Sequence, residues 1–147
     1  MYEEHDTIRF EIVTPERVVL KEQISKVTVP TKAGEITILP KHMPIVANLK
    51  PGVIELTKKD GEVEVMSVSG GFVEVLHNKV VILADTAERA EELDLLRAEE
   101  ARARAEKIKQ ETTQDDVENF ANITAQLEKE LARTKAVRRW KKIKRLD

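Results

Sequence analysis

The residues of this chain whose types and spacing bear on chemistry are few, and the most specific group is Leu93-Asp94-Leu95-Leu96-Arg97-Ala98. On a helix, Asp94 and Arg97 stand three residues apart on adjoining parts of one face, and Arg104 lies two turns beyond Arg97. The plain interpretation is an intrahelical salt bridge worth roughly a few tenths of a kcal/mol. The alternative is an anion site, in which Arg97 and Arg104 donate charge-assisted hydrogen bonds to a phosphate chain.

A second group is the basic end of the chain. Residues 133–147 hold eight basic side chains and one acidic one, with Arg138, Arg139, Lys141 and Lys142 around Trp140. One interpretation is a nucleic-acid-binding or membrane-surface module, in which the cations contact phosphates and the indole stacks or anchors. However, the first half of the chain lacks basic patches, and a basic helix tip suits an acidic protein surface equally well. We therefore expect a protein partner and no nucleic acid.

Catalytic constellations are scarce. His5, His42 and His77 are far apart and have no partner at ligand spacing. The sequence contains no G-x-S-x-G, no Walker-type loop and no G-x-G-x-x-G. We predict a chain that is not an enzyme, with no catalytic residues and no metal site.

The elements that must position these residues change abruptly along the chain. All five glycines and all five prolines lie before Phe72, and the following residues contain neither. Glycine and proline mark turns and interrupt helices, so the second half is free to form long helices. The sequence predicts a β domain over residues 1–86 and a helical hairpin over residues 87–147.

The first half shows the alternation of apolar and polar residues typical of half-buried strands. Asp60-Gly61 and His77-Asn78 mark two tight hairpins. Strands that recur every ten residues or so, with no helical pattern between them, indicate an antiparallel β-sandwich or β-barrel. The expected strands are 8–12, 24–29, 35–39, 53–57, 62–66, 72–76 and 79–83.

The second half has helical spacing, and we expect helices at about 87–110 and 115–144, joined by a polar loop. Two thin stripes line them: Ala98, Ala101, Ala105 and Ile108, then Phe120, Ile123, Leu127, Leu131 and Thr134. Such stripes bury little area against an ordering cost of about 1–2 kcal/mol per residue. The hairpin should therefore be marginal alone and able to leave the β domain and dock elsewhere.

Composition suits a soluble protein with a modest core. Charged residues make up 35% and aromatic residues 3% of the 147 residues, and there is no cysteine. No apolar run approaches the ~20 residues of a membrane span, and the acidic amino end does not look like a signal peptide. We expect no direct membrane insertion.

Across the whole chain the sequence resembles the epsilon subunit of F-type ATP synthases, called delta in mitochondria. The likeness is strongest in Gly34 to Gly52 and in Val68 to Ala98, with its S-G-G-F-x-E-V, L-A-D-x-A and L-D-x-x-R-A elements. Thr37 and Lys41 stand where the family commonly has glycine. The loop that leads to His42 is therefore expected to have a different shape.

The resemblance implies a central-stalk subunit of a rotary, proton-translocating ATP synthase. Its sandwich would contact the gamma subunit and the ring of c subunits, with Glu35 and His42 in the region facing the ring. Its hairpin would extend into the alpha/beta catalytic head and inhibit ATP hydrolysis, aided by the basic tail. The location implied is the cytoplasmic face of the bacterial plasma membrane, as a peripheral subunit.

The resemblance also implies a regulatory nucleotide site. In some bacterial members the Asp94–Arg97 element belongs to an ATP-binding motif, and ATP stabilises the folded-down hairpin. No cofactor is required, but ATP is a candidate ligand. Lys129 replaces an arginine of the binding relatives and cannot make the same bidentate contact, so weak binding is expected. By position, the candidate residues are Glu88, Leu93, Asp94, Arg97, Ala98, Arg104, Lys129 and Arg133.

Overall fold

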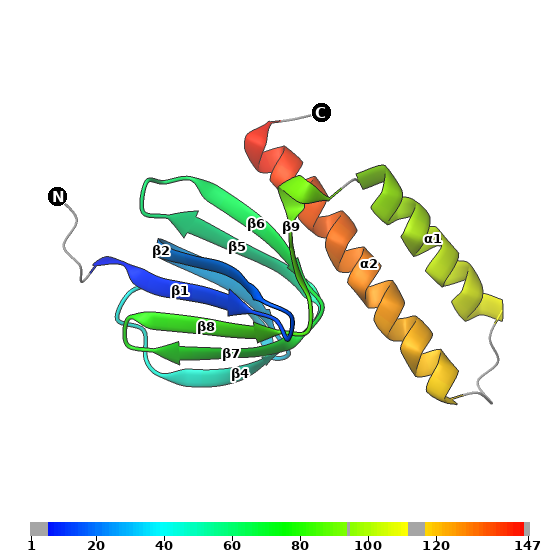
Figure 1. Cartoon of the computed structure of the whole chain (residues 1–147), viewed down its shortest axis with the longest axis horizontal. Helices are drawn as coiled ribbons and strands as arrows, with labels where there is room; N and C mark the ends of the chain where they lie inside the picture. The colour runs from blue at the N-terminus through cyan, green and yellow to red at the C-terminus, as the bar shows by residue number, and fades with distance from the viewer. Residues whose placement is uncertain (1–5, 94, 112–116, 146–147) are drawn as a thin grey trace.

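A computed structural model describes residues 6–93, 95–111 and 117–145. These residues form nine strands, a short 3-10 helix and two long α-helices (Figure 1). The strands are β1 (Ile8–Val13), β2 (Val18–Thr31), β3 (Gly34–Ile38), β4 (Ile45–Leu49), β5 (Gly52–Lys58), β6 (Val63–Val68), β7 (Gly71–Leu76), β8 (Lys79–Ala84) and β9 (Ala87–Arg89). The helices are η2 (Ala90–Glu92), α1 (Leu95–Glu111) and α2 (Val117–Lys144).

The strands form a β-sandwich whose two layers are joined by one long strand. One layer has the order β1-β8-β7-β4, and the other has the order β2-β5-β6-β9, with β3 beside β2. The first part of β2 pairs with β1, and its later part pairs with β5 and β3, so β2 belongs to both layers. The predicted antiparallel sandwich is confirmed, and the parallel pairing of β1 with β8 is the exception.

The core lies between the two layers and contains the inward-facing residues of the alternating strands. Ile8, Phe10 and Ile12 of β1 are fully buried, and Val73, Val75, Val80 and Ile82 of β7 and β8 lie beside them on the inner surface of the same layer. Burial of apolar surface at about 25 cal/mol per Å² makes this core the main stabilising contribution. The expected strands all form. The sequence does not predict β4, because Ile45-Val46-Ala47-Asn48-Leu49 is short and has an alanine and an asparagine.

The prediction that a helix begins at residue 87 is wrong. Residues 87–89 form β9, which pairs with β6, and α1 begins at Leu95. Local propensity favours a helix for Ala-Glu-Arg, but tertiary contacts decide otherwise. Ala87 and Ala90 are buried, and Arg89 Nη1 lies 3.2 Å from Glu64 Oε1 of β6. The sheet therefore continues past the expected domain boundary at residue 86.

Glu64 ties this last strand to its neighbours. It is nearly buried, and its second oxygen lies 3.5 Å from Lys58 Nζ of β5, so two cations flank one carboxylate. These are charge contacts without hydrogen-bond geometry. Burial lowers the pKa of Lys58, and the carboxylates of Glu64, Glu22 and Glu62 raise it, with a net upward shift. This stabilisation is present at neutral pH and is lost only as the pH rises through the pKa of folded Lys58.

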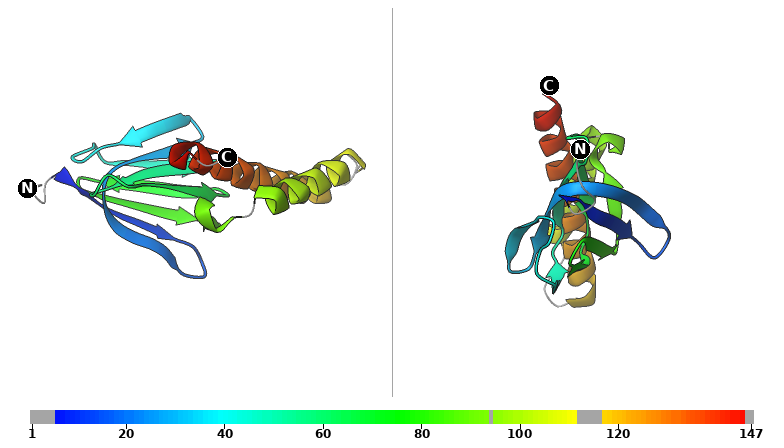
Figure 2. Two further views of the ribbon diagram at one scale, coloured as in Figure 1. Left: turned by 90° about the horizontal axis from the view of Figure 1, so that it is seen from above. Right: turned by 90° about the vertical axis from the view of Figure 1, so that its left-hand side faces the viewer.

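The hairpin docks on the sandwich through one end of α2. Ala136, Trp140 and Ile143 pack against Val53 of β5 and Val65 of β6. The two helices lie side by side, and their loop end projects past the sandwich (Figure 2). Near that end Lys109 Nζ lies 5.4 Å from the centre of the Phe120 ring, a cation–π contact between the helices.

The stripes expected on the helices are only partly correct. Ala105 is buried, but Ile108 is 50% exposed and Leu131 is 43% exposed. In the C-terminal part of α2 the buried residues are Ala132, Thr134, Ala136 and Val137, because this part faces both α1 and the sheet. The start of the second helix at residue 115 falls outside the described residues.

The two positions where the family commonly has glycine behave differently from each other. Thr37 lies in β3 as an ordinary strand residue, and its hydroxyl is 2.8 Å from that of Thr28. Lys41 takes the left-handed conformation, with φ of 65°, although it is not glycine. Its backbone N–H donates to the carbonyl oxygen of His77 (3.1 Å) and to Asn78 Oδ1 (3.2 Å), which holds the turn.

Gly71 at the start of β7 should be intolerant of any side chain. Its φ is 132°, and a Cβ there would lie 2.0 Å from the Leu83 carbonyl oxygen of β8. We expect Gly71→Ala to lower the free energy of unfolding by about 3 kcal/mol or more, from clash plus backbone strain. Gly61→Ala is the control, since Gly61 has φ of 91° but open space around it. It should cost only about 1–2 kcal/mol. Equal losses in urea unfolding would contradict the role of the clash.

Candidate functional site

A pocket of about 340 Å³ lies where the end of the sandwich meets both helices. Glu88 and Glu92 come from β9 and η2, Arg97 and Arg104 from α1, and Arg133 from α2. The β9–η2 segment turns the chain away from the sheet just before α1, which brings these three elements together (Figure 1). The pocket is lined by Glu88, Glu92, Leu93, Arg97, Ala101, Arg104, Glu130 and Arg133.

Arg133 is the centre of the polar contacts at this junction. Its Nε donates to both carboxylate oxygens of Glu88, at 3.1 and 2.9 Å, and its Nη2 also contacts Glu88. Its Nη1 donates to Glu130 Oε1 at 2.7 Å. Burial lowers the pKa of Arg133, but the hydrogen bonds and charges of Glu88 and Glu130 more than offset this and raise it. Arg133 therefore links the hairpin to the last strand of the sandwich.

Glu130 is a buried carboxylate in the wall of the pocket, with 2% of its surface exposed. Its Oε1 also accepts a hydrogen bond from Gln126 Nε2 at 2.9 Å. Sequence reasoning did not find Glu130 or Glu92. A glutamate in a charged helix gives no signal of burial, since burial here depends on how α2 docks.

The structure brings together five of the eight candidate nucleotide-site residues: Glu88, Leu93, Arg97, Arg104 and Arg133. Asp94 lies outside the described residues, and Ala98 lies within α1. Lys129 is half-buried on α2 next to Glu130 but is not among the residues that line the pocket. The predicted roles of these residues stay predictions.

Part of the basic tail is engaged within the chain. Arg139 Nη1 donates to Glu55 Oε2 of β5 at 3.1 Å, and Lys144 Nζ lies 4.0 Å from Glu62 Oε1. Arg138 donates to Glu99 of α1 at 2.7 Å. Lys141 is half-buried and Lys142 is exposed. In this conformation the sandwich and α1 thus supply carboxylates to three of the tail's cations.

The loop between β3 and β4 presents apolar side chains at the surface. Met43 is 77% exposed and Leu39 is 53% exposed. Glu35 is exposed on β3, and His42 Nδ1–H donates to the Met43 carbonyl oxygen at 2.7 Å. Glu35 therefore lies near the start of β3 and His42 in the loop that follows this strand, and their predicted role stays a prediction.

The outward face of β4, β7 and β8 carries a second apolar surface. Phe72 pairs with Leu83 across β7 and β8, and Asn48 of β4 pairs with Phe72 on the other side, so their side chains share one face. Val46 precedes Asn48 by two residues and is therefore on the same face. We call Val46, Phe72, Leu76 and Leu83 the outer apolar face; each is 46–74% exposed.

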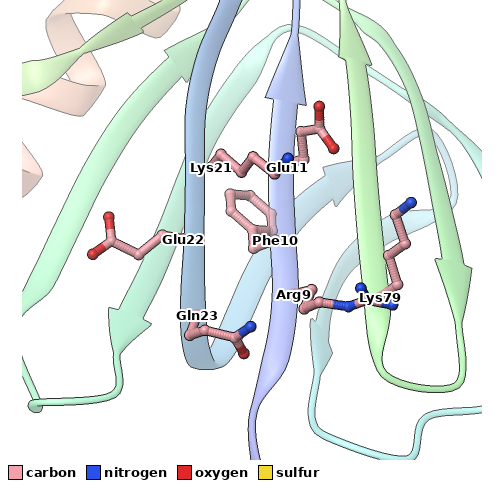
Figure 3. A pocket seen from close by; sticks show the side chains of 7 residues that line it. All are labelled: Arg9, Phe10, Glu11, Lys21, Glu22, Gln23 and Lys79. Carbon is pink, nitrogen blue, oxygen red and sulfur yellow. The ribbon is translucent and has the colours of Figure 1, made fainter.

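A further hollow of about 280 Å³ lies over β1 and its neighbours (Figure 3). Arg9 and Lys79 lie beside each other, and Lys21 reaches toward Glu11. Phe10 is buried beneath them. These are cross-strand neighbours on a sheet surface, with no nucleophile and base among them, so we assign no chemistry to this hollow.

The described residues contain neither a cluster of metal-binding side chains nor a helix that could span a membrane. No group of three or more histidine or acidic side chains in this part of the chain is placed to hold a metal ion. No described helix has both the length and the apolar content needed to cross a bilayer.

The sequence is similar to those of known proteins of one family. The family model described as "ATP synthase, Delta/Epsilon chain, beta-sandwich domain" matches residues 7–90. The ATP synthase epsilon chain of Dichelobacter nodosus is 42% identical over 132 residues, covering 87% of this chain and 92% of that protein. The epsilon chain of Chloroflexus aggregans is 52% identical over 98 residues, covering 67% of this chain and 70% of that protein.

Two solved structures share the fold. A chain of the Euglena gracilis mitochondrial ATP synthase, in a complex of OSCP, F1 and c-ring, superposes with a TM-score of 0.76 and 24% identity. The superposition covers 86% of the present chain and 79% of the Euglena gracilis chain. A chain of the Tetrahymena thermophila central stalk and c-ring has a TM-score of 0.50 and 20% identity, covering 58% of this chain and 68% of that chain.

The class of protein is defined by a β-sandwich, which the family model matches over residues 7–90, followed by two C-terminal helices. The chain belongs to the ATP synthase delta/epsilon family, as the family model and the epsilon-chain relatives show. The predicted family and fold class are confirmed, and the prediction of a non-catalytic subunit agrees with them.

Arg133 should control how firmly the hairpin is docked. Arg133→Met removes the link to Glu88 and leaves Glu130 buried without its cation, so we expect the docked state to lose about 1–3 kcal/mol. Trp140 is the only tryptophan and packs against the sheet, so its emission reports undocking. Lys135→Met, on the exposed side of α2, is the control for loss of one charge. A Trp140 emission maximum and urea midpoint that are alike in both variants would contradict this role.

Proposed function

We propose that this chain is the non-catalytic epsilon-type subunit of the central stalk of a rotary, proton-translocating ATP synthase. In this role its sandwich couples the gamma subunit to the c-ring, and its hairpin inhibits ATP hydrolysis in the alpha/beta head. The observation that carries the proposal is family membership together with two exposed apolar surfaces on a sandwich that needs neither for its own core. The implied location is peripheral, at the cytoplasmic face of a bacterial plasma membrane.

The outer apolar face is our candidate for the gamma contact. Exposed aromatic and aliphatic side chains grouped on one sheet face are typical of protein interfaces, and α2 packs against β5 and β6 of the other layer. The β3–β4 loop, with His42 and Met43, and Glu35 of β3 are the candidates for the c-ring contact. The names of two structural neighbours, which include F1, c-ring and central stalk, support partners of this kind.

Phe72→Glu should therefore abolish or strongly weaken gamma binding, because it buries a charge in the proposed interface. We expect the Kd for the gamma subunit of the same organism to rise roughly tenfold or more. Val18→Glu is the matched control, since Val18 is 53% exposed, as Phe72 is, but lies on β2 outside the outer apolar face. Calorimetric titration measures both. Equal binding by the two folded variants would remove the assignment of this face to gamma.

The proposed inhibition requires the hairpin to leave the sandwich, and the contacts suit a reversible latch. The docking residues are small, apart from Trp140 and Ile143, and ion pairs surround them. Arg139 and Glu55 are each about one-third exposed, so their pair is screened by water and salt. Arg138, Arg139, Lys141 and Lys142 would exchange these internal carboxylates for acidic surface in the catalytic head.

Glu55 and Arg139 should consequently affect inhibition in opposite ways. Glu55→Gln weakens only the docked state, and we expect inhibition of ATP hydrolysis by the reconstituted head to increase about two- to fivefold. Arg139→Gln removes the same pair but also a cation that would meet the head, so inhibition should not increase. Glu16→Gln, in an exposed turn of the sandwich, is the control. If Glu55→Gln and Glu16→Gln inhibit alike, the latch does not limit extension.

The pocket between β9, α1 and α2 is our proposed site for regulatory ATP. Three guanidinium groups from two helices line it, and its volume is at the small end of the range for ligand pockets. Arg97, Arg104 and Arg133 would hold the phosphates, and a ligand that contacts both helices and β9 would favour the docked hairpin. The alternative, a nucleic-acid-binding tail, has less support, because Arg138, Arg139 and Lys144 face carboxylates of this same chain.

A further inference from the structure

Glu130 is a buried charge that the stability of the fold does not explain. Its side chain lines the pocket, and its Oε2 is buried without a hydrogen-bond partner among the described residues. A buried carboxylate with one unsatisfied oxygen carries a desolvation cost, and an apolar residue of the same size would avoid that cost. Position 130 therefore calls for an explanation in the function of the pocket.

We infer that Glu130 sets the affinity of this pocket by acting as an internal anion. It holds the guanidinium of Arg133 while the pocket is free of ligand and opposes the entry of a polyphosphate chain. This inference rests on the nucleotide site proposed above and adds a residue that determines how tightly that site binds.

The charges that line the pocket are balanced before any ligand arrives. Three arginines (Arg97, Arg104 and Arg133) and three glutamates (Glu88, Glu92 and Glu130) line it. The Nε side of Arg133 is taken by Glu88, and its Nη1 by Glu130. A phosphate chain that bound Arg133 would have to displace these carboxylates.

The two carboxylates on Arg133 differ in their freedom to leave. The Glu88 side chain is 26% exposed, so it can turn toward water when a phosphate replaces it. Glu130 has no such route, because its side chain is only 3% exposed and is held by Gln126 within the same helix. Its negative charge would stay beside the bound phosphates, where low solvent access makes like-charge repulsion strong. The pocket would thus bind nucleotide weakly even with its arginines present.

The decisive variant is Glu130→Gln, which keeps the shape and an oxygen acceptor for Arg133 but removes the charge. The full chain is titrated by calorimetry with ATP and, separately, with inorganic triphosphate, which tests the phosphate chain without the base. We expect Glu130→Gln to lower the Kd for both ligands roughly tenfold or more. Glu128→Gln, the exposed neighbour on α2, carries the same change of net charge and should stay within about twofold of wild type.

Each outcome decides the matter. A folded Glu130→Gln that binds both ligands no tighter than the wild type overturns the inference and leaves the nucleotide site standing. Equal gains in Glu130→Gln and Glu128→Gln also overturn it, because net charge would then be the cause. If neither wild type nor variants bind ATP or triphosphate at millimolar concentration, the proposed nucleotide site itself fails. Glu130→Met, which fills the same space without charge, serves if the amide variant does not fold.

Discussion

The position of the helical hairpin depends on one helix, α2, which has to pack against two neighbours at once. The C-terminal part of α2 packs against β5 and β6 on one side and against α1 on the other. Alanine at positions 132 and 136 and threonine at position 134 allow these close approaches. Small side chains bury little apolar area, so the docked state relies more than a typical core on the ion pairs around it. The stability of the docked hairpin therefore depends on salt, on ligand and on competing partners.

That constraint explains where the charged residues are. Arg133, Arg139 and Lys144 lie along α2, and each has a carboxylate partner on the sandwich. Pairs at the exposed rim contribute little individually, whereas the half-buried junction at Arg133 contributes more, because its donors are shared by two carboxylates. The junction is also the point at which β9, α1 and α2 meet. A change there is felt by all three elements, which is what a regulatory site requires.

The sequence allowed most of the sandwich to be predicted, because alternation in β1, β7 and β8 coincides with burial. It failed where local preference and tertiary structure disagree. Ala87-Glu88-Arg89 has helical propensity, yet buried Ala87 and the Arg89–Glu64 contact place it in the sheet. Similarly, Leu131 is the largest apolar residue of its turn but is exposed, since the neighbours of α2 need small residues on the docked side. The periodicity of apolar residues in the sequence shows neither the need for small side chains on the docked side of α2 nor the burial of Glu130.

The candidate site was predictable in part for the same physical reason. Arg97 and Arg104 lie on one helix, so their spacing alone brings them together. Glu88 and Arg133 are 45 residues apart, and only the resemblance to a family linked them before the structure did. The carboxylates of the lining have the largest effect on what the site can bind. The sequence motif contributes arginines to the pocket and suggests that it is cationic. The full lining holds three arginines and three glutamates, so the charges of the pocket are balanced. A pocket already neutralised by its own chain differs from an empty cationic pocket in what binding must accomplish. The ligand has to replace internal partners, so its affinity reflects the difference between two sets of ion pairs and not the strength of one.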